Sequence, residues 1–179
     1  NPLPGDLTVE AAVIGAGMAG ILTAYLLQKQ GIDVIVLDAD QVASGQTKNT
    51  TAKITSQHGI IYQDLIKKLG KQKARTYALA NEAAIRAYGE IVGEEKIECG
   101  FERLPSYLYT REPSMVVRLE QEAQAASALG IPAHFTQIHG LPFDTMGAVC
   151  FEGQAQFHPL AFLKHLSQKV TVYEGTRVL

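Results

Sequence analysis

A glycine-rich turn near the N-terminus constrains the fold of this chain more than any other feature. Residues 13–20 read Val-Ile-Gly-Ala-Gly-Met-Ala-Gly, after a short apolar run and before a segment whose apolar residues have helical spacing. Gly15 allows a tight turn out of a strand, Gly17 lets backbone amides approach a pyrophosphate, and Gly20 lets the helix pack on the strand. The pattern predicts a helix that begins near Gly17 and points its free N–H groups at phosphate.

A second strand and an acidic residue complete this pattern. Gly31 ends the predicted helix, and residues 32–37 are rich in Val and Ile. Strand, turn, helix and strand form a βαβ unit, whose two strands are expected to be parallel neighbours. Asp38 follows the second strand, where a carboxylate accepts hydrogen bonds from ribose hydroxyls and would repel the 2′-phosphate of NADP. The turn and the acid therefore predict a dinucleotide with a free ribose diol, either FAD or NAD.

The loop after Asp38 carries a resemblance to a known family. Residues 42–47 read Val-Ala-Ser-Gly-Gln-Thr, and residues 49–55 read Asn-Thr-Thr-Ala-Lys-Ile-Thr. Together with residues 34–40, these segments resemble the FAD-dependent oxidoreductases of the D-amino acid oxidase and glycine oxidase superfamily. They look closest to a bacterial branch of amino-acid or glycine dehydrogenases. Hydroxyl-rich residues also suit a polyol-phosphate chain, which needs neutral donors and acceptors, although a solvated linker is the alternative.

The resemblance implies which residues contact FAD. Residues 44–47 would lie near the phosphates or the ribityl chain, residues 50–53 nearer the isoalloxazine ring, and Val178 against the adenine. A cation at Lys53 would stabilise anionic reduced flavin and raise its potential, unless Lys53 is simply a surface lysine. The candidate cofactor-binding residues are Gly15, Gly17, Met18, Ala19, Gly20, Asp38, Ala39, Ser44, Gly45, Gln46, Thr47, Thr50, Thr51, Ala52, Lys53 and Val178.

The rest of the chain predicts an α/β domain interrupted by a β-rich insertion. Residues 101–110 are aromatic and β-prone, and residues 131–157 read as short strands and turns. We expect a Rossmann-like FAD-binding domain with a parallel sheet, discontinuous and incomplete, over residues 1–95 and 156–179. A partial substrate or cap domain is expected over residues 96–155. Family members continue further, so the resemblance implies a truncated family fold.

Composition and the remaining reactive residues narrow the function. A net charge of −2 gives no basic field for nucleic acid, and no apolar run reaches the roughly 20 residues of a membrane span. The five histidines form no helical pair and have no cysteine nearby in sequence, which argues against a metal site. Cys99 and Cys150 form no CxxC pair, so a cytoplasmic setting is expected. Ser106 lacks the glycines of a nucleophile elbow.

The resemblance implies a parent enzyme that oxidises a small amine or amino acid by hydride transfer to flavin N5. Some members of the bacterial branch carry a C-terminal Rieske domain, but this chain has no Cys-x-His ligand pairs. Tyr107 and Tyr109 are candidates to face substrate, and no catalytic acid or base is assigned. We expect this portion to be inactive alone and able to self-associate through an open sheet edge. The alternatives are an NAD-dependent dehydrogenase and a non-catalytic nucleotide-binding or interaction module.

Overall fold

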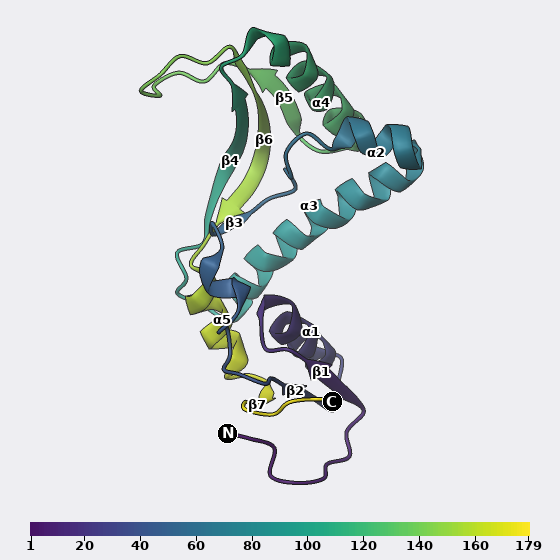
Figure 1. The fold of residues 1–179 in the computed structure, drawn as a ribbon, viewed down its shortest axis with the longest axis vertical. Helices are drawn as coiled ribbons and strands as arrows, with labels where there is room; N and C mark the ends of the chain where they lie inside the picture. The colour runs from purple at the N-terminus through teal and green to yellow at the C-terminus, as the bar shows by residue number, and fades with distance from the viewer. The chain divides into compact units, whose positions relative to one another are not determined.

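The computed structural model describes all of residues 1–179 and divides into two compact units (Figure 1). The first unit contains residues 1–52, 95–100 and 157–179. The second unit contains residues 53–94 and 101–156. The chain therefore passes between the units four times, and the first unit is assembled from three separate segments.

A three-stranded parallel sheet, in the order β1-β2-β7, forms the centre of the first unit. The elements of this unit are β1 (Ala11–Ile14), α1 (Met18–Lys29), β2 (Val34–Leu37), the 3-10 helix η1 (Gln46–Asn49), α5 (Pro159–Ser167) and β7 (Thr171–Tyr173). Val36 and the helix residues Ile21 and Ala24 are buried completely. β1 and β7 are the edge strands, and self-association through them remains a prediction.

The second unit is an antiparallel sheet with helices packed on one face. Its elements are β3 (Lys53–Ile54), α2 (Tyr62–Leu69), α3 (Lys71–Glu94), β4 (Glu102–Thr110), the 3-10 helix η2 (Pro113–Met115), α4 (Val116–Leu129), β5 (Ala133–Thr136) and β6 (Gly147–Gln156). β6 lies centrally and pairs with β3, β4 and β5. Val149 and Phe151 of β6 pack in one core with residues of α2, α3 and α4, such as Tyr62 and Leu119.

These observations confirm the predicted α/β class and the parallel βαβ unit, and they add detail that the sequence did not show. The segment predicted as short strands and turns contains β6, a ten-residue strand. The two units also differ from the predicted division, because residues 53–94 belong to the second unit. The reason is packing: Ala74 and Ala78 of α3 face the core built on β6. No helix is long and apolar enough to cross a membrane.

Glu95 joins two separate segments of the first unit. Its carboxylate accepts a hydrogen bond of 2.7 Å from the Tyr25 hydroxyl and forms a 2.8 Å ion pair with Lys169. The hydrogen bond from Lys169, followed by that from Tyr25, lowers the pKa of Glu95. A carboxyl group whose pKa is lowered by folding stabilises the folded state above its unfolded pKa, and that stabilisation is lost as the pH falls through the folded pKa.

We therefore expect Glu95→Gln to reduce the free energy of unfolding by about 1 kcal/mol at pH 7. The difference from the wild type should shrink as acid protonates Glu95, and urea unfolding at a series of pH values measures it. Glu90→Gln is the control, since Glu90 is an exposed helix residue. A Glu95→Gln difference that stays constant from pH 7 to pH 3 would contradict the proposed linkage.

Candidate cofactor-binding site

The glycine turn joins β1 to α1 and leaves the start of α1 open. Gly15 has φ +100°, a conformation that glycine adopts at little cost. Its N–H donates to the Leu37 carbonyl of β2 over 2.8 Å. Gly17 is the N-cap residue, and the first turn of α1 has neither a side-chain cap nor an acidic residue. The positive end of the helix dipole and the N–H groups of Ala19 and Gly20 are therefore available to an anion, whereas the Met18 N–H donates to Thr47.

The fold requires glycine at position 20 but not at position 17. A Cβ on Gly20 would lie 1.8 Å from the carbonyl oxygen of Gly15, a backbone atom. A Cβ on Gly17 would meet only Thr47 Oγ1, at an ordinary contact distance of 3.6 Å. Its φ of −82° and ψ of −172° suit any residue. The space in front of Gly17 thus has the form of a cradle that a side chain would fill, as a closely approaching pyrophosphate requires.

The Asp38 carboxylate lies against this turn. Its Oδ2 accepts a 2.5 Å hydrogen bond from the Ala16 N–H, and its Oδ1 accepts a 2.8 Å hydrogen bond from the Asp40 N–H. A carboxylate has about four lone-pair positions, so two remain for further donors. The two backbone contacts hold the side chain at the end of β2, the position from which an acid can accept hydrogen bonds from a ribose diol.

The loop after Asp38 packs back onto the turn. The Ala43 N–H donates to the Ala16 carbonyl over 3.1 Å, and the Met18 N–H donates to Thr47 Oγ1 over 3.2 Å. Thr47 is only 7% exposed, which is low for a hydroxyl residue in a loop. Ala43 has φ +61°, a left-handed conformation that a non-glycine residue adopts only where its surroundings hold it. The hydroxyl-rich loop is therefore part of the turn's immediate surroundings.

Glu174 is a residue of this region that the sequence reasoning missed. Its Oε1 accepts a 2.7 Å hydrogen bond from the Val42 N–H and so holds the start of the loop. The parallel pairing of Leu37 with Tyr173 brings Glu174 beside Asp38. The sequence signal that could have found Glu174 is its place directly after β7, which matches the place of Asp38 directly after β2. Recognising it required the register of β2 and β7, which the sequence does not provide.

The structure places most of the candidate residues in the first unit. Gly15, Gly17, Met18, Asp38 and Thr47 lie together at the carboxyl ends of β1 and β2. The other candidates in this unit are Ala19, Gly20, Ala39, Ser44, Gly45, Gln46, Thr50, Thr51, Ala52 and Val178. Lys53 differs, because it belongs to the second unit, where it pairs with Gln156 of β6. It lines a cavity of about 200 Å³ with Thr55 and Ser106.

Comparison with known proteins identifies the family. The family model described as FAD dependent oxidoreductase (DAO) matches residues 10–179. The chain belongs to this family. A relative, YhfW of Bacillus subtilis (strain 168), is named as a Rieske 2Fe-2S iron-sulfur protein and is 38% identical over 176 residues. That alignment covers 98% of this chain and 34% of YhfW. Since FAD is the dinucleotide of this family, the alternative of an NAD-dependent dehydrogenase is excluded.

Solved structures show the same fold. L-proline dehydrogenase from P. horikoshii has a TM-score of 0.74 at 17% identity, over 96% of this chain and 45% of that chain. Glycine oxidase from Bacillus cereus ATCC 14579 has a TM-score of 0.69 at 16% identity, over 94% of this chain and 46% of that one. The chain thus spans about a third of YhfW and less than half of either solved structure. This confirms the resemblance to the N-terminal portion of the family fold.

Proposed function

We propose that this chain binds the adenosine and pyrophosphate parts of FAD in an enzyme that oxidises an amine or amino acid. The observation that carries the proposal is the start of α1, which has no N-cap side chain, with an open cradle at Gly17 beside the Asp38 carboxylate. Bound FAD would accept the hydride. The chain's own residues bind and orient that cofactor, since flavoproteins chiefly position and tune the flavin.

In this proposal, different residues contact different parts of FAD. The amides of Gly17, Ala19 and Gly20 hold the pyrophosphate, while the Met18 N–H donates to Thr47. The two unused acceptor positions of Asp38 bind a ribose diol, and Val178, which is 46% exposed, lies against the adenine. Residues 44–47 contact phosphate or ribityl oxygens. Residues 50–52, which end this part of the unit, extend towards the flavin. The backbone of Ala39 lies next to Asp38 in sequence and is expected to contact the same part of the cofactor.

The names of similar solved structures support the proposed substrate class. L-proline dehydrogenase and glycine oxidase, by their names, act on amino acids. We extend that class to the parent protein as a small amine or amino acid. Tyr107 and Tyr109 remain candidates for substrate contact, since both are exposed on β4. We also propose a cytoplasmic location, because Cys99 and Cys150 are both buried and are not joined in a disulfide.

The absorption spectrum of the purified full-length protein tests the proposal. We expect flavin bands that bleach without oxygen when an amino-acid substrate is added. Asp38→Asn should weaken FAD binding roughly tenfold, the loss of one charge-assisted hydrogen bond. Asp33→Asn is the matched control, because Asp33 is an exposed acid just before the same strand.

Three results would count against the proposal in different ways. A colourless protein that takes up no FAD would overturn it. A flavoprotein that no amine or amino acid reduces would overturn the substrate class alone. Equal weakening by Asp38→Asn and Asp33→Asn would remove Asp38 from the site. Iron analysis of the same sample tests whether the full-length protein also holds a Rieske centre, as the name of YhfW says of that relative.

A further inference from the structure

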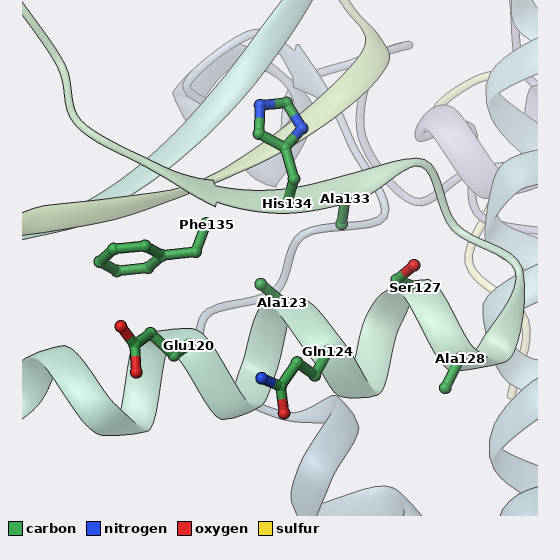
Figure 2. A pocket seen from close by; sticks show the side chains of 8 residues that line it. All are labelled: Glu120, Ala123, Gln124, Ser127, Ala128, Ala133, His134 and Phe135. Atoms are coloured by element: carbon green, nitrogen blue, oxygen red, sulfur yellow. The ribbon is translucent and has the colours of Figure 1, made fainter.

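The face of the second unit's sheet that is turned away from the helices carries three metal-ligating side chains. Strand register pairs His134 of β5 and Tyr107 of β4 with the same residue, Cys150 of β6. Glu152 lies two positions along β6 and therefore on the same face as Cys150. Figure 2 shows the His134 ring pointing away from α4, whereas Phe135 points towards it. The three side chains thus gather on one face.

The spacing of the ligand atoms suits a single ion. Cys150 Sγ lies 3.4 Å from Glu152 Oε1, and His134 Nδ1 lies 3.9 Å from the same oxygen. All three ligand atoms lie within 4.8 Å of one another. In a tetrahedral zinc site, ligand atoms at the usual bond lengths are about 3.3–3.6 Å apart. The side chains of His134 and Glu152 are 53% and 51% exposed, so small rotations can close the remaining gap.

We propose that His134, Cys150 and Glu152 bind a divalent metal ion of the zinc class. Imidazole nitrogen, thiolate sulfur and carboxylate oxygen are all zinc ligands, whereas calcium and magnesium prefer sites made only of oxygen. Three protein ligands leave a fourth position for water or another ligand, and Tyr107 of β4 is the strand partner of Cys150. These three residues belong to the second unit, whereas the glycine turn and Asp38 of the proposed FAD site belong to the first.

Metal binding at this site exchanges a proton for an ion. The Cys150 thiol donates a hydrogen bond to the Glu152 carboxylate over 3.4 Å. When zinc binds, the S–H bond breaks, a zinc–sulfur bond forms and the proton passes to solvent. No electron is transferred.

Cobalt serves as the spectroscopic probe of the site. Titration of the full chain with Co²⁺ is expected to give a sulfur-to-cobalt charge-transfer band and tetrahedral visible bands that saturate at one equivalent. Zn²⁺ should then displace them. Cys150→Ser should remove the charge-transfer band, whereas Cys99→Ser, which alters the other buried cysteine, should leave it unchanged.

Two exposed ligand variants keep the test independent of folding. His134→Ala and Glu152→Gln should each weaken Zn²⁺ binding by at least tenfold in competition with a chromogenic chelator. His139→Ala, in the exposed loop after β5, should have no effect. The absence of one-to-one binding, or affinity indifferent to His134→Ala and Glu152→Gln, would overturn the proposal and leave only a hydrogen-bonded cluster. Neither readout depends on flavin, so failure here is distinct from failure of the proposed function.

Discussion

Replacing Gly20 with alanine is expected to disrupt the glycine turn and abolish FAD binding. The new Cβ would lie 1.8 Å from the Gly15 carbonyl oxygen and 3.0 Å from its carbonyl carbon, both of which are backbone atoms. Helix α1 must then move away from β1, and a forced overlap in a packed region costs about 3 kcal/mol. Urea unfolding of the full-length protein measures the loss of stability, and flavin fluorescence measures the loss of cofactor binding.

Gly17→Ala is the matched control for this prediction. It separates the effect of a glycine substitution on folding from its effect on FAD binding. Position 17 has an ordinary backbone conformation, and a Cβ there meets no atom closer than 3.6 Å. We expect its stability to stay within about 1 kcal/mol of the wild type. FAD affinity should nevertheless fall at least tenfold, because the methyl group fills the space for the pyrophosphate. Wild-type FAD affinity in Gly17→Ala would mean that the pyrophosphate binds elsewhere.

The parts of the fold predicted from sequence are those with local signals. The β1–α1–β2 unit is specified by glycines and apolar periodicity within a short stretch, and both helix ends follow from Gly17 and Gly31. The position of Asp38 follows from its place at the end of β2. Glu174 could not be found in the same way, because its contact with the Val42 N–H spans 132 positions in sequence.

The same limit explains why the sequence predicted neither the proposed metal site nor the boundary between the units. The histidines looked scattered because sequence spacing detects ligand pairs only within one helix or turn. His134 and Cys150 become neighbours through the antiparallel register of β5 and β6. Likewise, the spacing of apolar residues in α3 predicts a helix but does not predict which sheet that helix packs against. Its assignment to the second unit depends on the core around Phe151.

Glu122 provides the largest expected loss of stability in the second unit. This residue of α4 is completely buried, yet its carboxylate has three backbone donors at the start of α2. Oε1 accepts from the Ile61 and Tyr62 N–H groups, each over 2.7 Å, and Oε2 accepts from the Gln63 N–H over 3.0 Å. α2 has no cap from its own side chains, so a carboxylate from another helix satisfies its first N–H groups.

We expect Glu122→Ala to reduce the free energy of unfolding by about 3–5 kcal/mol, because it leaves buried N–H groups without acceptors and opens a cavity. Glu122→Gln should cost about 2 kcal/mol, since the amide keeps one oxygen but turns an NH₂ group towards N–H donors. Urea unfolding of the full chain measures both. Glu120→Ala, two residues earlier on the same helix and only half-buried, should change stability by less than about 0.5 kcal/mol. If the two alanine variants unfold alike, Glu122 does not hold the start of α2.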